Sequence, residues 1–181
     1  MFDSLTYDKV TEQEMNNIIK ERCSVMEEYE IHVGTDSQSY SGTNVVVVVL
    51  ILEMGDISNK ARFFFSKTTR VKRFENLRVK IESEVNESIM LGLRLKEFCR
   101  QNDIPEERVE IDLDVGRNGP TKDLIQAMVG WVVGSGFKCN IKPDSPAASS
   151  IADKKSKKGS GRAPVPHIRP PRKHKSKLAI N

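Results

Sequence analysis

Cysteine and histidine are both scarce in this chain of 181 residues, which contains three of each. The cysteines are Cys23, Cys99 and Cys139. Their odd number, wide spacing and lack of a CxxC pair argue against a disulfide framework and against a zinc site, so we interpret them as buried core thiols. The histidines are His32, His167 and His174. They do not have the spacing of zinc ligands, so any metal is expected to bind oxygen ligands instead.

Long apolar runs are also missing. No stretch approaches the roughly 20 apolar residues that span a bilayer. Residues 1–10 contain Asp3 and Asp8 and lack the basic and apolar regions of a secretory signal. With 38% hydrophobic and 30% charged residues, the composition is that of a globular protein, and the length fits one domain with a short appendage. These absences predict a cytoplasmic protein that is not bound to a membrane.

Acidic residues are absent from the last part of the chain. Residues 154–181 contain ten Lys or Arg residues and no Asp or Glu, whereas residues 1–153 contain 19 basic and 25 acidic residues, a net charge of −6. The basic segment is also rich in proline and cannot bury enough apolar surface to offset its ordering entropy. The composition therefore predicts a disordered basic tail over residues 157–181. The tail either attracts phosphate backbones or is a solubilising extension.

The first half of the chain has the pattern of one helix followed by three strands. Residues 11–22 have helical spacing, and Thr11 followed by Glu14 is a capping box. Residues 29–36, 44–53 and 61–69 are predicted strands that form an antiparallel meander. The second of these contains five consecutive valines and is expected to be buried on both faces.

The second half alternates helices and strands. Residues 74–101 have a period of 3.6 and form the longest predicted helix. A strand at 109–115, a helix at 121–133 and a strand at 137–141 follow, and Ser145-Pro146 is typical of the start of a last helix. The order βββαβαβα predicts an α/β fold with a five-stranded mixed sheet flanked by helices. We predict an N-terminal helical segment over residues 1–28 and the domain itself over residues 29–156.

Two aspartates lie at the ends of predicted strands. Asp36 ends the first strand and Asp114 ends the fourth. If these strands are parallel neighbours, both carboxylates emerge at the carboxyl edge of the sheet, where ligands bind in open α/β sheets. Two alternatives remain. Asp36 and Ser37 can form a simple turn, and Asp112 shares a face with Asp114, as on an edge strand with a polar side.

The helices supply further candidate carboxylates. With Ile81 at 0° and about 100° per residue, Glu84 falls near 300° on the apolar stripe, whereas Glu82 and Glu87 fall on its flanks. A carboxylate on a buried stripe is costly unless it is paired or bound to a metal. The last helix offers Asp153, with Asp144 just before it as the alternative. Three or four converging acids would repel one another unless cations neutralised them, which favours Mg²⁺ or Mn²⁺.

The motifs around these carboxylates resemble a known family. The matching blocks are residues 34–38, 80–85, 114–119, 142–145 and 152–154. Their order is similar to that of the ribonuclease H-like superfamily, and more specifically to the poorly characterised bacterial YkuK-type family, over residues 29–155. The resemblance implies a nuclease that hydrolyses phosphodiester bonds in RNA or DNA with two Mg²⁺ or Mn²⁺ ions. It also implies the catalytic residues and metal ligands, which are Asp36, Glu84, Asp114 and Asp153.

The basic and aromatic side chains do not show by themselves how nucleic acid would bind. The basic residues at the start of the long helix are Lys67, Arg70, Lys72, Arg73, Arg78 and Lys80. They form either a track for phosphates or a solvated helix face. Trp131 and the phenylalanines at 63–65 are expected in the core. Because the superfamily includes domains that have lost their chemistry, the alternative is a non-catalytic module that binds nucleic acid or assembles with other molecules.

Overall fold

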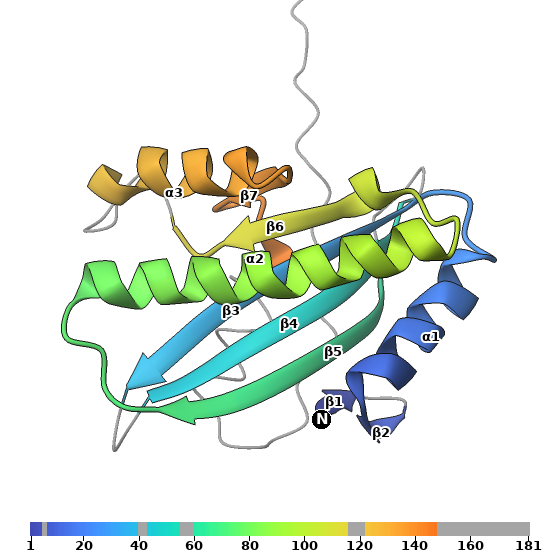
Figure 1. Ribbon diagram of the computed structural model, residues 1–181, viewed down its shortest axis with the longest axis horizontal. Coiled ribbons are helices and arrows are strands. Elements are labelled where there is room, and N and C mark those ends of the chain that lie inside the picture. The colour runs from blue at the N-terminus through green and yellow to red at the C-terminus, as the bar shows by residue number, and fades with distance from the viewer. Residues whose placement is uncertain (5–6, 40–42, 55–59, 116–121, 148–181) are drawn as a thin grey trace, which may run out of the picture.

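A computed structural model describes residues 1–4, 7–39, 43–54, 60–115 and 122–147. The chain forms one mixed sheet whose strands lie in the order β2-β1-β5-β4-β3-β6-β7. The strands are β1 (Phe2–Ser4), β2 (Asp8–Val10), β3 (Tyr29–Ser39), β4 (Thr43–Glu53), β5 (Lys60–Val71), β6 (Val109–Leu113) and β7 (Lys138–Ile141). The helices are α1 (Glu12–Cys23), α2 (Leu77–Gln101) and α3 (Lys122–Gly134), with a short 3₁₀ turn at Glu106–Arg108. Figure 1 shows α2 lying across one face of the sheet.

All five predicted strands are present, and two short strands that were not predicted extend the sheet. β1 and β2 form an antiparallel pair, and β1 joins the edge of β5 through Asp3 opposite Ser66 and Ser4 opposite Phe65. Strands of three residues are too short to show an alternating pattern, so only their partner in the sheet makes them recognisable. The N-terminal segment therefore contains a hairpin as well as the predicted helix.

The strand directions bring several carboxyl ends to one edge. β4 is antiparallel to both β3 and β5, so β3 and β5 run in the same direction. β6 is parallel to β3, and β7 is parallel to β6. The carboxyl ends of β3, β5 and β6 therefore point to the same edge, where α2 also begins (Figure 1). This confirms the premise that the first and fourth predicted strands are parallel neighbours.

Local capping explains where the helices begin. Thr11 and Glu14 form the predicted capping box, with the Thr11 hydroxyl accepting from the Glu14 backbone N–H and the Glu14 carboxylate accepting from the Thr11 backbone N–H. α2 begins three residues later than predicted because the Asn76 side chain accepts from the Val79 backbone N–H and caps the helix there.

The sheet has apolar residues on both faces. The larger core lies between the sheet and α2 and includes Ile31, Val33 and Ile111. A smaller cluster contains Val46, Val48, Leu50, Leu52 and Ala147. β4 supplies both clusters with alternate residues, which confirms that this valine-rich strand is buried on both faces.

The cysteines lie in or near the core as predicted, whereas Trp131 does not. Cys23 and Cys99 are buried and Cys139 is partly buried, as expected of core thiols. Trp131, predicted in the core, is instead 39% exposed. α3 turns Met128 and Val132 inward, and Trp131 lies about 100° around the helix from Val132. The exposed indole is therefore a correction to the sequence prediction.

Three predictions concern residues beyond those described. Within the predicted last helix, Ser145 and Ala147 are buried, but the rest of that helix lies outside the described residues. The same is true of Asp153 and of the basic tail predicted over residues 157–181.

Among the helices that the structure describes, none combines the length and the apolar character needed to cross a bilayer.

Candidate functional site

Asp36 lies near the carboxyl end of β3, opposite Val46 of β4, and is buried. Side chains alternate along a strand, so Asp36 points away from the face that carries Thr35 and Ser37. That face packs on α2: the Thr35 hydroxyl lies 2.7 Å from the Ser88 hydroxyl. Asp36 is therefore part of a regular strand, not of the turn considered as its alternative.

Glu84 occupies the sheet-facing stripe of α2, as its helical angle predicted, and is 8% exposed. Its Oε1 accepts a hydrogen bond of 2.6 Å from the Ser37 hydroxyl and lies 3.5 Å from Lys80 Nζ. Burial raises the pKa of Glu84 to about 7, and the negative charge of Asp36 contributes to the rise, while Lys80 and Ser37 oppose it. Glu84 and Asp36 thus repel each other across the end of β3.

Asp114 follows the last residue of β6. Gly34 and Asp112 are level in the parallel pair, and Asp36 and Asp114 lie two residues further along their segments, at the same edge of the sheet. Asp114 Oδ1 lies 2.6 Å from Lys142 Nζ, and the Asp114 side chain is partly buried. Asp114 already has a cationic neighbour in this arrangement.

Among the described residues, the predicted ligands do not form a closed metal site. Within the described ranges, Asp36, Glu84 and Asp114 do not bring three ligand atoms within 4.8 Å of one another. Asp153 lies outside the described residues. Its alternative, Asp144, is exposed, and its backbone N–H donates to the Ile141 carbonyl in a turn after β7. The assignment of all four ligands therefore remains a prediction.

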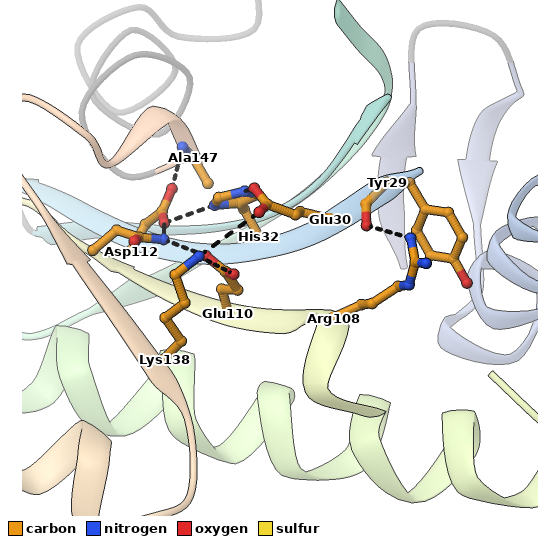
Figure 2. A network of polar contacts seen from close by, with 9 residues as sticks. Tyr29, Glu30, His32, Arg108, Glu110, Asp112, Lys138 and Ala147 are labelled. Carbon is orange, nitrogen blue, oxygen red and sulfur yellow. Dashed lines mark hydrogen bonds and ion pairs between the residues drawn. The ribbon is translucent and has the colours of Figure 1, made fainter. Parts of the chain in front are cut away.

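A different group of metal-ligating side chains does converge. Glu30 and His32 of β3 and Glu110 of β6 place one ligand atom each within 4.8 Å of the others. These three residues lie on the face of the sheet opposite α2, closer to the amino ends of the strands (Figure 2). His32 Nε2 is 3.1 Å from Glu30 Oε2. We refer to Glu30, His32 and Glu110 as the His–Glu cluster.

Asp112 supports this cluster from inside the protein. Its side chain is fully buried, and its Oδ1 lies 2.9 Å from His32 Nδ1 and accepts from Asn140 Nδ2 at 3.1 Å. Its Oδ2 accepts from the Ala147 backbone N–H at 2.7 Å. Lys138 reaches the cluster from β7, with Nζ 2.6 Å from Glu110 Oε1 (Figure 2). β6 is therefore an internal strand, and its polar side is packed, not an exposed edge.

The charges in this network shift the pKa of His32 upward. Burial lowers this pKa, but the charge of Asp112 and hydrogen bonds to Asp112 and Glu30 outweigh it and raise the pKa to about 10. The hydrogen bond from His32 in turn lowers the pKa of Glu30. In the absence of metal the imidazole is thus protonated at neutral pH and donates from both ring nitrogens.

The His–Glu cluster was not predicted, because its histidine and glutamates do not have the spacing of zinc ligands along the chain. A signal existed: Glu30 and His32 are two residues apart, as are Glu110 and Asp112, so each pair shares one face of its strand. Only the register of the parallel pair, which sets His32 opposite Glu110, shows that the two faces coincide.

The predicted basic residues lie at the carboxyl edge but on different surfaces. Lys67, Arg70, Lys72 and Arg73 are exposed, at the end of β5 and in the connection to α2. The register of β5 against β4 places Arg70 on the face of Asp36 and Lys67 on the face of α2. Arg78 instead pairs with Glu82 one turn away on α2, with Nε 2.7 Å from Oε1, as expected of a solvated helix face.

Comparisons with known proteins agree with this architecture. Residues 10–157 match the protein family described as "Ribonuclease H-like". Over 139 residues the chain is 30% identical to a protein of Bacillus subtilis (strain 168) described as "Uncharacterized protein YkuK". The aligned region covers 70% of this chain and 78% of the relative. No solved structure gives a significant match.

Proposed function

This chain belongs to the ribonuclease H-like family, and we propose from this premise that it is a metal-dependent nuclease. The proposed reaction is hydrolysis of phosphodiester bonds in RNA or DNA. One observation carries the proposal: the buried Glu84 carboxylate accepts from Ser37, the residue that follows Asp36 on β3. Such a buried carboxylate is costly for a purely structural protein and useful for one that binds cations.

The carboxylates fit Mg²⁺ or Mn²⁺, which prefer oxygen ligands. Lys80 is the cation near Glu84, yet the pKa of Glu84 still rises to about 7. The local positive charge therefore does not offset the cost of burying this carboxylate, and a divalent cation would stabilise its ionised form. In the proposed site Asp36, Glu84, Asp114 and Asp153 hold two such ions.

The chain's own residues position the carboxylates and the substrate. Two bound divalent ions at such a site supply an activated water and neutralise the leaving oxygen in phosphodiester hydrolysis. Ser37 fixes the orientation of Glu84 by donating to Oε1. Lys80 is partly exposed beside Glu84 and is suited to contact a phosphate of the substrate.

Nucleic acid would approach the carboxyl edge of the sheet. The residues proposed to bind its phosphates are Lys67, Arg70, Lys72, Arg73 and Lys80. β5 and β3 lie on either side of β4 and end at the same edge of the sheet, so the cations at the end of β5 lie at the edge that carries Asp36. They offset an otherwise acidic body, whose net charge over residues 1–153 is −6.

A cleavage assay with matched variants tests the proposal. The full chain is incubated with labelled RNA, DNA, hybrid and junction substrates in Mn²⁺, in Mg²⁺ and in EDTA. Glu84→Gln keeps the size of the side chain and its acceptor for Ser37 but removes the charge. Glu82→Gln, two residues earlier on the helix flank, is the control. We expect metal-dependent cleavage by the wild type and by Glu82→Gln, and a loss of at least about a hundredfold in Glu84→Gln.

The same assay identifies the alternative function. A non-catalytic nucleic-acid-binding or assembly module would bind the oligonucleotides without cutting them in either metal. Its binding would also be unchanged by Asp36→Asn apart from an effect on stability. Binding without cleavage of any of the four substrates, in either metal, would therefore overturn the nuclease assignment.

A further inference from the structure

The orientation of His32 is fixed from the interior of the protein. The Asp112 carboxylate accepts from His32 Nδ1 at 2.9 Å and is itself held by the Ala147 backbone N–H and by Asn140. A carboxylate acceptor requires the proton to be on Nδ1, which directs Nε2 toward Glu30. This pairing of a buried carboxylate with one ring nitrogen is the support found behind histidines that bind metals through the other nitrogen.

The opposite ring nitrogen faces the Glu30 carboxylate, and Glu110 lies nearby. His32 Nε2 is 3.1 Å from Glu30 Oε2, and one ring nitrogen of His32, a Glu30 oxygen and a Glu110 oxygen lie within 4.8 Å of one another. Bonds of about 2.0–2.1 Å in a tetrahedral arrangement place ligand atoms about 3.3 Å apart. The three ligand atoms would move closer together around one ion, and Lys138 Nζ, now 2.6 Å from Glu110 Oε1, would move away from that oxygen.

The buried network around the His–Glu cluster has an excess of negative charge, which a bound cation would offset. Glu30, Glu110 and Asp112 carry three negative charges, and His32 when protonated and Lys138 carry two positive charges. One negative charge is left without compensation in this group. A divalent ion held by the His32 ring and the two glutamates would add positive charge to a group that has more carboxylates than cations.

We propose that the His–Glu cluster is a second metal site that takes a divalent transition-metal ion of the Zn²⁺ type. One imidazole nitrogen and two carboxylate oxygens suit Zn²⁺ better than Mg²⁺, which prefers oxygen ligands alone. Glu30 is the ligand at the surface, with 27% of its side chain exposed, so an ion can enter from that side. His32 and Glu110 are buried and form the inner wall.

This site is separate from the nuclease carboxylates. Asp36 is four residues beyond His32 on the same face of β3, about 13 Å away at 3.3 Å per residue. The ion would link β3 to β6 directly and, through Asp112 and Ala147, to the segment after β7. Its role is to hold these elements together on the face opposite α2, and it does not depend on whether the chain cuts nucleic acid.

Titration of the metal-free full chain with Co²⁺, followed by displacement with Zn²⁺, tests the second site. Imidazole bound to Co²⁺ gives strongly shifted proton resonances in NMR spectra, which a site made only of carboxylates cannot give. We expect these resonances at one equivalent of Co²⁺ and their disappearance when Zn²⁺ is added. Glu84→Gln, which alters the nuclease carboxylates, should leave them in place.

Three variants test the ligand assignment. Glu30→Gln, at the exposed rim, should weaken Co²⁺ binding at the shifted-resonance site at least tenfold while the chain stays folded. Asp112→Asn should weaken it by about 10–100-fold, as expected for a partner behind the ligand. His32→Asn should abolish the resonances. Glu82→Gln is the control and should bind like the wild type.

Two results would overturn the proposal. One is the absence of shifted imidazole resonances in the wild type at saturating Co²⁺. The other is an unchanged affinity in Glu30→Gln, which decides the matter even if His32→Asn fails to fold. A chain that binds Co²⁺ through His32 but cuts no substrate would support the second site and contradict only the nuclease assignment.

Discussion

The Ser37 hydroxyl donates a 2.6 Å hydrogen bond to Oε1 of Glu84, joining β3 to α2 at the end of the strand. The preceding residue, Asp36, points to the other face of the sheet. Asp36 thus contributes one carboxylate, and its neighbour Ser37 orients a second one, Glu84 of α2. This link is the most direct structural support for treating Asp36 and Glu84 as one functional unit.

Ser37→Ala should weaken metal binding at the nuclease carboxylates. The hydroxyl stabilises the ionised form of Glu84, so its loss raises the pKa of Glu84 further and lowers the affinity for Mn²⁺ by about tenfold. Ser88→Ala is the control, because Ser88 makes a similar buried contact with Thr35 between the same strand and helix. Both variants should lose about 1 kcal/mol of stability. Equal Mn²⁺ affinities in calorimetry would contradict the role given to Ser37.

The stability of the metal-free chain should depend on pH through Glu84. Its pKa is about 7 in the folded chain and 4.5 in the reference state, so its contribution is fully present below pH 4.5 and is lost as the pH rises through 7. Urea unfolding of the wild type and Glu84→Gln in EDTA at pH 4.5, 6 and 8 measures this. The variant should gain stability relative to the wild type toward pH 8, by at most about 3 kcal/mol. Glu82→Gln should show no such trend relative to the wild type.

Asp112 and Asp114 should differ in what they affect. Asp114→Asn is predicted to abolish metal-dependent cleavage in a stable protein. Asp112→Asn should leave most of the cleavage per folded molecule but cost about 3 kcal/mol in stability, because its buried carboxylate pairs with His32 and accepts from Ala147. Denaturant unfolding and single-turnover cleavage of the folded fraction separate the two effects. If folded Asp112→Asn loses cleavage and Asp114→Asn retains it, the metal ligand on this strand is Asp112 and not Asp114.

The basic tail should set affinity for nucleic acid and leave the cleavage step alone. Each phosphate neutralised contributes about one unit to the slope of log K against log salt. A chain ending at Lys155 lacks most of the ten basic residues found from residue 154 onward, so its slope should be flatter and its binding weaker at low salt. The measurement is binding of one labelled oligonucleotide over a range of salt concentrations. An unchanged slope would leave the tail as a solubilising extension, and lost cleavage at saturation would assign it to the active site.

Local patterns in the chain predict most of the helices and strands and the buried position of Glu84. The period of 3.6 in α2 placed Glu84 on the buried stripe and Glu82 on its flank, and the valine run of β4 predicted a strand buried on both faces. Thr11 and Glu14 predicted the start of α1. These features depend on residues close together in the chain, so local geometry is enough to find them.

Which distant side chains meet depends on how the strands pair. The parallel register that sets His32 opposite Glu110 joins residues 78 positions apart, and no local pattern contains that alignment. No local pattern shows that Asp112 is buried and paired with His32 either. Arg70 and Lys67 looked like one basic group, but the alternation of β5 divides them between two faces. Strand periodicity specifies which side chains share a face, whereas the pairing of strands specifies which faces coincide.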